Sequence, residues 1–354
     1  MRSFDYSYLS LRTWDNEILS YVAKIHEYKG KQELYLRQKP VELERLVEVA
    51  KVQSTESSNR IEGIITTRSR LQQLVEDKTT PRNRDEKEIL GYRNVLNLIH
   101  ENYEYIPFRS NYILQLHRDL LQYTELTYGG KYKAISNEID AVLPNGEKRI
   151  LFKPLEPYET PGAIEQICDS YQRTLEQEIV DPLILIPCVI LDFLCVHPFN
   201  DGNGRMSRLL ILLLLYRNDY VVGKYISIEK EISETKEAYY QALAQADLGW
   251  HEGTNDPKPF IKYMLGIILK CYREFEERLT ISEKSGKRST SYDVVKTYVN
   301  NTIGTFTKKD AMENCPSLGS SSVESALKKL VEEGAIIRKG NGRSSHYVRK
   351  DAVE

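Results

Sequence analysis

The chain has 354 residues, 41% of them hydrophobic, and a formal net charge of -2 at neutral pH. The length predicts two or three domains, and the near-neutral charge argues against a global affinity for nucleic acid or membranes. The N-terminus carries no apolar signal core, and the longest uncharged apolar runs, 182–191 and 209–216, fall far short of the ~20 residues that cross a bilayer. Five cysteines without metal-type spacing are expected to be reduced thiols in a cytoplasmic protein.

Helical periodicity dominates the chain as far as residue 280, so a mostly α-helical fold is expected. Proline at position 40 suits the first turn of a helix, and Gly63 suits the residue that ends one. In chain order, the predicted helices span Trp14–Tyr28, Pro40–Gln53, Ser57–Ile61, Asp85–Tyr103, Ser110–Leu121, Gly162–Gln177, Pro182–Cys195, Gly204–Arg217, Ser233–Ala246 and Lys258–Leu279.

One segment, Asp140–Phe152, departs from this helical pattern. Strand-forming residues lie on both sides of Pro144-Asn145-Gly146, and Asn-Gly between such runs is a strong signal for a β-hairpin. A lone hairpin is marginally stable unless it docks on something. Two interpretations stay open: a flap that only packs on the helices, or an edge to which a substrate chain adds as a strand.

The C-terminal part changes character after a polar linker that follows Thr280. Three predicted helices, Tyr292–Asn300, Lys308–Asn314 and Ser321–Glu333, precede two short strands around Gly340-Asn341-Gly342, which is the outline of a winged helix-turn-helix module. Ser321–Glu333 would be the recognition helix, and three basic residues would lie in or beside the wing: Arg338, Lys339 and Arg343. The module is expected to bind either DNA or a protein.

The segment 197–208 reads His-Pro-Phe-Asn-Asp-Gly-Asn-Gly-Arg-Met-Ser-Arg, between two apolar helices. Gly202 and Gly204 permit positive φ and close approach, so the backbone amides here are expected to form an anion-binding nest at a helix N-terminus. Arg205 and Arg208 lie three residues apart on the first turn, where they would face nearly the same way and clamp phosphate oxygens.

Two further residues of the segment complete a reactive centre. Asp201 is a hard oxygen ligand of the kind that Mg²⁺ prefers, and His197 is the one residue of the segment that titrates near neutral pH. Each feature alone is usually a turn, a packing residue or a solvated helix face. Together, within one short window, they indicate phosphoryl or nucleotidyl transfer.

The segment resembles the signature of the Fic family, H-P-F-x-[D/E]-G-N-[G/K]-R-x-x-R, at every fixed position. The resemblance implies a helical core with a β-hairpin flap above the site, and transfer of AMP from ATP to a Tyr, Thr or Ser hydroxyl with pyrophosphate as the leaving group. It also implies these roles: His197 as general base, Asp201 as the Mg²⁺ ligand, Gly202, Asn203 and Gly204 as the phosphate cradle, and Arg205 and Arg208 as ligands of the β- and γ-phosphates.

Two other segments extend the resemblance. Tyr239 and Tyr240 look like the family's downstream Tyr-Tyr helix, which lines the adenine pocket, although core packing explains a tyrosine pair equally well. The run from Ser58 to Gly63 fits the pattern [S/T]-x-x-x-E-[G/N] of the family's inhibitory helix, in its N-terminal placement. By this resemblance the carboxylate of Glu62 would pair with Arg208 and misalign ATP, whereas a capped surface helix is the alternative.

Three domains are predicted: 1–105 with the inhibitory helix, 106–279 as the Fic core, and 280–354 as the winged helix. The expected function is protein adenylyltransferase; the alternatives are a phosphodiesterase that removes AMP at the same site and a DNA-binding regulator that senses nucleotide. Expected partners are a target protein at the Asp140–Phe152 flap or the chain itself, and DNA or a protein at the C-terminal module. No membrane partner is expected, and a homodimer stays open.

Overall fold

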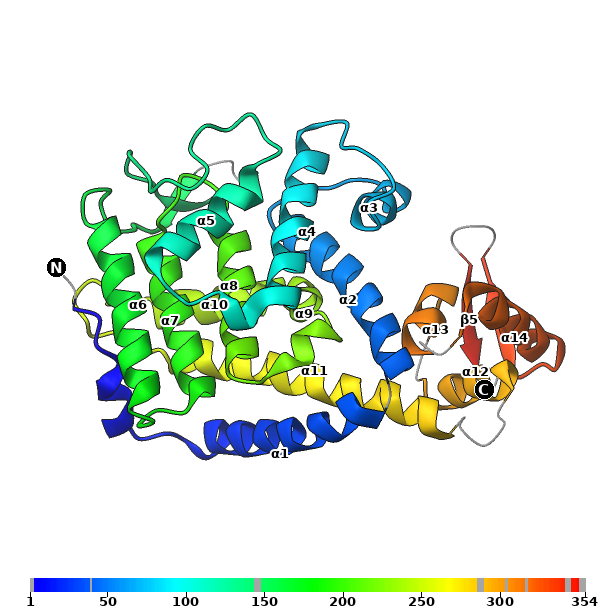
Figure 1. Cartoon of the computed structure of the whole chain (residues 1–354). Helices are drawn as coiled ribbons and strands as arrows, with labels where there is room; N and C mark the ends of the chain where they lie inside the picture. The colour runs from blue at the N-terminus through cyan, green and yellow to red at the C-terminus, as the bar shows by residue number, and fades with distance from the viewer. Residues whose placement is uncertain are drawn as a thin grey trace. The chain divides into compact units, whose positions relative to one another are not determined.

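The computed structural model describes residues 3–38, 40–142, 148–284, 290–302, 305–315, 318–340 and 345–349. The chain is mostly helical, as predicted, and divides into two compact units (Figure 1). The first unit contains residues 1–29 and 51–271, and the second contains residues 30–50 and 272–354. Three long helices contribute residues to both units: α1 (Asn16–Gln38), α2 (Pro40–Ile61) and α11 (Lys258–Lys284).

The core of the first unit is a group of packed helices: α4 (Arg84–Asn102), α5 (Ser110–Leu121), α6 (Thr160–Glu176), α7 (Pro182–Val196) and α8 (Asn203–Arg217). Helix α7 packs between α6 and α8, and α4 packs against both α5 and α8 (Figure 1). Nearly every residue of α7 and α8 is buried, because α7 and residues 209–215 of α8 are apolar on all faces and the polar first turns of α8 are covered as well. These two buried helices therefore hold the ends of the loop between them, residues 197–202.

The structure corrects the prediction for α2, which is continuous where two helices, Pro40–Gln53 and Ser57–Ile61, were expected. The intervening Ser and Thr hydroxyls usually favour caps and turns over helix interiors. Here Ser54 is buried and donates to Glu229 Oε2 at 2.7 Å, so its hydroxyl has a tertiary partner. The helix ends as predicted, because Gly63 adopts φ 79° directly after it.

The remaining elements of the first unit are short. Helix α3 (Arg68–Val75) was not predicted, and the expected helix Ser233–Ala246 is two helices, α9 (Ile228–Glu234) and α10 (Lys236–Ala246), separated at Thr235. The 3₁₀ helices are η1 (Tyr6–Leu11), η2 (Tyr103–Tyr105) and η3 (Val221–Lys224). Within the described part of the chain, no helix has both the length and the apolar character required to cross a bilayer.

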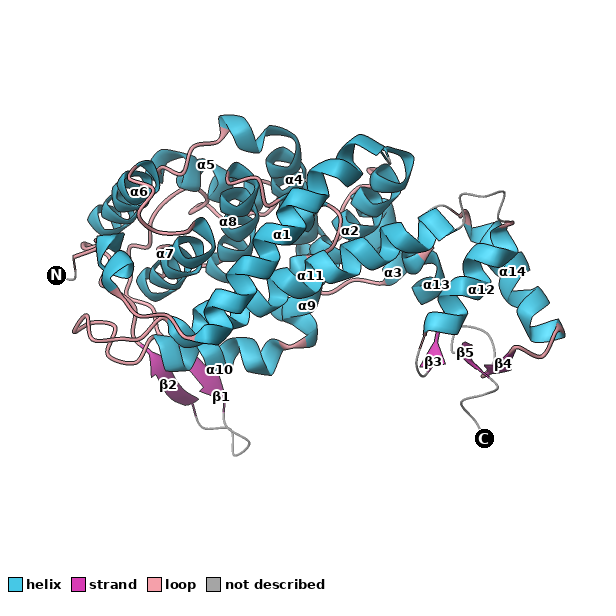
Figure 2. Cartoon of the chain, turned by 90° about the horizontal axis from the view of Figure 1, so that it is seen from below, coloured by secondary structure: helices cyan, strands magenta, loops and turns pink. Residues whose placement is uncertain are grey.

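The predicted hairpin is present as two antiparallel strands, β1 (Ile139–Val142) and β2 (Lys148–Phe152), with Ala141 opposite Arg149. The turn, residues 143–147, lies outside the described residues. The hairpin lies beside α10 (Figure 2), and the Phe152 ring packs against Trp250 and stacks on His251, at centroid distances of 5.9 and 5.4 Å. These ring contacts fix the base of β2 to the helical core.

The C-terminal part of the second unit contains α12 (Ser291–Asn301), α13 (Lys308–Asn314) and α14 (Ser320–Glu332), close to the predicted bounds. A three-stranded sheet has the order β3 (Thr305–Phe306), β5 (His346–Arg349), β4 (Ile336–Lys339), in which β3 was not predicted. The hydrophobic core of this C-terminal part includes Val295, Val323, Leu327, Leu330 and Ile336. Arg343, expected in the wing, lies outside the described residues.

Candidate active site

The loop 197–202 turns the chain sharply at both of its ends. His197 follows α7 in a left-handed conformation (φ 50°, ψ 61°), and Gly202 precedes α8 with φ 84°. Glycine adopts such angles freely, whereas histidine does so only where surrounding contacts hold it. Between them, Phe199 is fully buried and anchors the middle of the loop.

The imidazole of His197 is held in the form that a general base requires. Its Nδ1 lies 3.3 Å from the carbonyl oxygen of Leu194, which assigns the proton to Nδ1 and leaves a lone pair on Nε2. The pKa of His197 is lowered to about 4, mainly by burial and in part by the charge of Lys133, whereas the hydrogen bond to Leu194 and the charges of Glu62 and Asp201 oppose this shift. His197 is therefore neutral at pH 7.

The segment 133–137 binds the backbone of this loop. Lys133 is buried, and its Nζ donates to the carbonyl oxygen of Val196 at 3.0 Å while its backbone amide donates to that of Pro198 at 2.9 Å. Asn137 Nδ2 donates to the carbonyl oxygen of Phe199 at 3.1 Å. Sequence analysis missed these residues, because nothing in their local pattern distinguishes them from other polar loop positions.

Two side chains shape the second half of the loop. His117 Nδ1 accepts from the Gly130 amide at 3.1 Å, so its Nε2 carries the proton and donates to the carbonyl oxygen of Asp201 at 3.0 Å. Asn203, expected in the phosphate cradle, uses its side chain to bind both backbone groups of Phe199, at 2.9 and 2.8 Å. Its side chain therefore shapes the loop, and only its backbone amide is left for a ligand.

The first turn of α8 offers the amides that the nest requires. The bond from Met206 N to Gly202 O, 2.8 Å long, is the first of the helix, so the amides of Asn203, Gly204 and Arg205 precede the intrahelical pattern. A Cβ at Gly204 would collide with the carboxylate of Glu62. A carboxylate therefore lies against the helix start, where the amides and the helix dipole favour an anion.

Arg208 is buried and held by the end of α2. Its Nη2 donates to Glu62 Oε1 at 2.7 Å and to Ser58 O at 2.9 Å, and its Nε donates to Ser58 Oγ at 2.8 Å. The side chain of Glu62 is 33% exposed. Burial opposes its ionisation, but the charge and hydrogen bond of Arg208 prevail and hold the pKa of Glu62 below its ordinary value. The ion pair expected between Glu62 and Arg208 is thus present.

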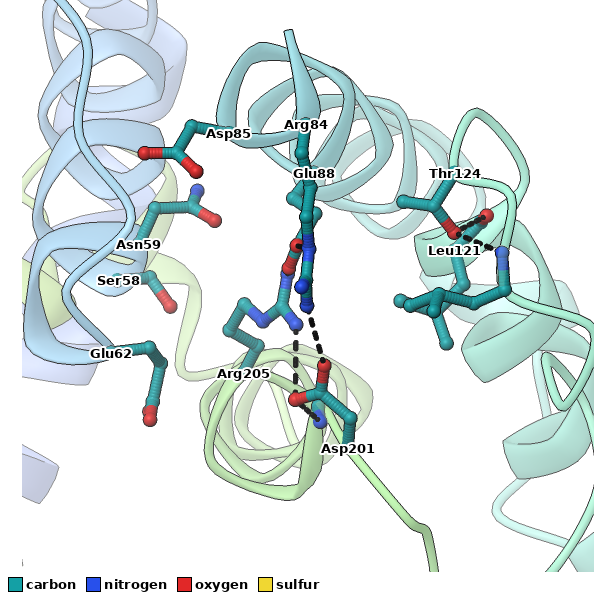
Figure 3. A network of polar contacts seen from close by, with 12 residues as sticks. Ser58, Asn59, Glu62, Arg84, Asp85, Glu88, Leu121, Thr124, Asp201 and Arg205 are labelled. Carbon is teal, nitrogen blue, oxygen red and sulfur yellow. Dashed lines mark hydrogen bonds and ion pairs between the residues drawn. The ribbon is translucent and has the colours of Figure 1, made fainter.

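Arg205 has a different partner, which corrects the expectation that the two arginines face one way. Its Nη1 lies 2.8 Å from Glu88 Oε2, on α4, and this pair is buried, with side chains 1% and 3% exposed. Its Nη2 lies 3.5 Å from Asp201 Oδ1 (Figure 3). Arg205 Nε is buried without a hydrogen-bond partner among the described residues, so the guanidinium retains a donor for a ligand.

Glu88 also binds Arg84, and both arginines approach Asp201, so four charged side chains form a closed ring (Figure 3). Arg84 Nε donates to Glu88 Oε1 at 2.8 Å, and Arg84 Nη2 lies 3.8 Å from Asp201 Oδ2. Asp201 Oδ1 accepts from the Gly202 amide at 2.6 Å. Local sequence pattern did not indicate Arg84 or Glu88, because they reach the loop from another helix.

A magnesium ion would find the partly exposed carboxylate of Asp201 here, 37% exposed and beside the amides of α8. Among the described residues, no cluster of three or more His, Cys, Asp or Glu side chains forms a protein metal site. Mg²⁺ commonly binds through one or two carboxylates together with substrate phosphates and waters. The residues therefore fit a magnesium ion whose remaining ligands come from a bound nucleotide and water.

The two tyrosines of α10 have different environments. Tyr239 is buried among Phe260, Tyr263 and its neighbour Tyr240, at ring distances of 6.0, 5.7 and 5.3 Å, as a core residue would be. Tyr240 is 45% exposed, and the charges of Glu62 and Arg208 act on its hydroxyl. Of the pair, Tyr240 is the one whose ring is open to a ligand.

A separate cavity of about 930 Å³ lies between η1, residues 153–156 and the turn at 251–255. Among the described residues that line it, Asp192 comes closest in sequence to the loop, and none belongs to 197–208. The chemistry that the sequence predicts therefore lies at the loop and not in this cavity.

Comparison with known proteins matches residues 107–215 to the family model "Fic/DOC family". Proteins named "Protein adenylyltransferase Fic" from Nematostella vectensis and Culex quinquefasciatus are 24% and 25% identical over 63% of this chain. The alignments cover 48% and 41% of those relatives, so this chain spans less than half of their length.

Solved structures show the same fold. A Fic family protein from Desulfovibrio desulfuricans superposes with a TM-score of 0.61 at 20% identity, over 96% of this chain and 97% of that one. Fic-1 from C. elegans superposes with a TM-score of 0.58 at 19% identity, over 75% and 73% of the two chains. Residues 107–215 thus match the Fic/DOC family model, and the solved structures show that the chain has the fold of Fic proteins.

Proposed function

We propose that this chain is a protein adenylyltransferase, which transfers AMP from ATP to a hydroxyl side chain of a protein. The observation that carries the proposal is the position of Glu62, whose carboxylate lies over Gly204 and binds Arg208. A carboxylate in that position marks an anion site made of helix amides and a buried guanidinium. The relatives named protein adenylyltransferase support the same reaction.

His197 would act as the general base. Its neutral imidazole, with the Nδ1 proton directed to Leu194, has Nε2 available to take the proton of the target hydroxyl. The hydroxyl oxygen then attacks the α-phosphorus of ATP, a new P–O bond forms, and the bond to the bridging oxygen of the β-phosphate breaks. AMP stays on the target and pyrophosphate leaves.

The α8 amides and the arginines would stabilise the charge that develops during this transfer. Asn203, Gly204 and Arg205 offer their amides, Arg208 its guanidinium once Glu62 moves, and Arg205 the free donor at Nε. Asp201 would hold Mg²⁺, which supplies neutralisation of charge on the α- and β-phosphates.

Glu62 would act as an inhibitor of the same site. Its carboxylate binds Arg208 and lies against Gly204, so it would withhold Arg208 from a nucleotide and put a negative charge where a phosphate oxygen would lie. ATP would then bind with a displaced α-phosphate, and a misplacement of about 1 Å can cost ~10²-fold in rate. Because the side chain of Glu62 is one-third exposed, a modest movement of this residue would open the site.

The hairpin would receive the target protein. Ile150 and Leu151 on β2 are 54% and 56% exposed, unusually open positions for large apolar side chains. A target segment that adds to β2 as a strand would cover them and present its hydroxyl to His197. For the C-terminal helices and sheet we propose a winged-helix module for DNA or a protein partner, in a cytoplasmic protein.

The test is to incubate the wild-type protein and Glu62→Gly with Mg²⁺ and ATP labelled in the α-phosphate. Label on protein in Glu62→Gly, more than in wild type, supports AMP transfer. Loss of label from a target modified beforehand, without transfer, supports the phosphodiesterase instead. The absence of both reactions would leave a nucleotide-sensing regulator and contradict the proposal.

A further inference from the structure

Each of the two arginines in the loop signature is neutralised by a carboxylate from a different helix region. Arg208 pairs with Glu62, after α2, and Arg205 pairs with Glu88, on α4. The first pair is partly open, since the Glu62 side chain is 33% exposed, whereas Glu88 is 3% exposed. A buried pair is costly to break, because either partner would be left as an uncompensated charge. Release of Glu62 therefore frees one guanidinium, and Arg205 stays compensated.

Arg84 is a third guanidinium at the same place, and it is open to solvent. Its side chain is 68% exposed, and Nε donates to Glu88 while Nη2 lies 3.8 Å from Asp201 Oδ2. Figure 3 shows Arg84 and Arg205 approaching Asp201 together, from different helices. The proposed magnesium ligand thus has an exposed guanidinium as its neighbour.

The position of Arg84 within its own helix is electrostatically unfavourable. Arg84 is the first residue of α4, where the helix dipole favours acidic side chains. The next two residues, Asp85 and Glu86, follow that preference, and Asn83 caps the helix through the Glu86 amide at 2.9 Å. The i,i+4 ion pair with Glu88 offsets part of this cost, but it uses Nε and leaves Nη2 directed toward Asp201.

We propose that Arg84 contacts the β- or γ-phosphate of the bound nucleotide, as a phosphate ligand supplied by α4 from outside the loop signature. This inference rests on the proposed ATP site. Glu88 then has two functions: it compensates the buried Arg205, and its bond to Arg84 Nε orients the guanidinium so that the Nη atoms face the ligand. Since AMP has neither of the outer phosphates, Arg84 should discriminate ATP from AMP.

The test is the affinity of ATP and of AMP, each with Mg²⁺, measured by calorimetry in the Glu62→Gly protein with and without Arg84→Gln. ATP affinity is expected to fall by about tenfold in Arg84→Gln, and AMP affinity by less than about twofold. The matched control is Lys87→Gln on the same helix, which removes a cation that pairs with Glu125 and should leave both affinities unchanged. An unchanged thermal midpoint checks that each variant is folded.

Three results would overturn the inference. Unchanged ATP affinity in Arg84→Gln removes Arg84 from the phosphate site while the proposed function stands. An equal loss of ATP and AMP affinity makes Arg84 a residue of general site structure. If the Glu62→Gly parent itself binds no ATP, the proposed function fails and the inference fails with it.

Discussion

The two ion pairs made by the arginines of α8 differ in solvent exposure. This difference distinguishes a pair that can open, which we call the switch, from a pair that stabilises the fold, which we call the support. Arg208 and Glu62 meet where the carboxylate is one-third exposed, whereas Arg205 and Glu88 are both buried. A partly exposed carboxylate regains water when it leaves and a buried one does not, so Glu62 should leave Arg208 more readily than Glu88 leaves Arg205. Two ion pairs one helical turn apart can therefore have opposite uses.

The largest expected effect concerns His197, the proposed general base. His197→Ala in the Glu62→Gly protein should reduce AMP transfer by about 10³-fold or more, because a positioned general base contributes ~10²–10⁴-fold. The rate of label incorporation measures it, and unchanged ATP affinity is the control. Transfer at the parental rate would show that His197 is not the base.

The next prediction tests whether the Glu62 pair acts through charge. Glu62→Gln keeps the size of the side chain but removes its negative charge, so it should raise transfer by about 10²-fold, nearly as much as Glu62→Gly. Glu62→Asp, which keeps the charge, is the matched control and should stay close to wild type. If Gln were as inactive as Glu, the inhibition would be steric.

Loss of the buried Arg205–Glu88 pair should mainly lower the stability of the protein, whereas loss of the Arg208–Glu62 pair should mainly change its activity. Glu88→Gln leaves Arg205 as an uncompensated buried charge, and it should lower the free energy of unfolding by about 3 kcal/mol. Glu62→Gln, matched in chemistry, should cost less, about 1 kcal/mol, because Arg208 keeps its two hydrogen bonds to Ser58. Urea unfolding at pH 7 compares them, and equal losses would contradict the distinction between switch and support.

The smallest expected effect is that of pH on kcat/KM, which should stay nearly constant between pH 7 and pH 5. Because burial lowers the pKa of His197 to about 4, the base stays deprotonated as pH falls from 7 to 5. Loss of Glu62 removes a charge that raises this pKa, so Glu62→Gly should show the acid limb of kcat/KM near pH 4 or below.

An ordinary histidine would instead lose about tenfold in kcat/KM by pH 5.5. Such a loss would contradict the burial of His197. The ATP affinity of His197→Ala in the same background, measured over the same pH range, separates titration of the nucleotide from titration of the base.

Much of the helical framework could be predicted from sequence. Periodicity and caps located Ser110–Leu121 and Lys308–Asn314 at their observed bounds. Errors arose where tertiary contacts override local preference, as at Ser54, whose hydroxyl binds Glu229 and lets α2 continue. The two strands of the hairpin were predicted because the signals for a hairpin are local in sequence.

The residues of the site could be predicted only where they are close together in the sequence. The stretch from His197 to Arg208 carries its chemistry in one window, and the Glu62 pair followed from a second short pattern. Lys133 and Glu88 contact the loop from distant segments, and one sequence contains no signal for which helix faces which. The same limit explains why Arg205 was assigned to phosphate alone.

The most direct test of the central claim compares ATP labelled in the α-phosphate with ATP labelled in the γ-phosphate, each incubated with Glu62→Gly and Mg²⁺. Our account predicts that protein acquires the α-label and never the γ-label, because the bond to the β-phosphate breaks and pyrophosphate departs. Protein that carries the γ-label, or neither label, would contradict it.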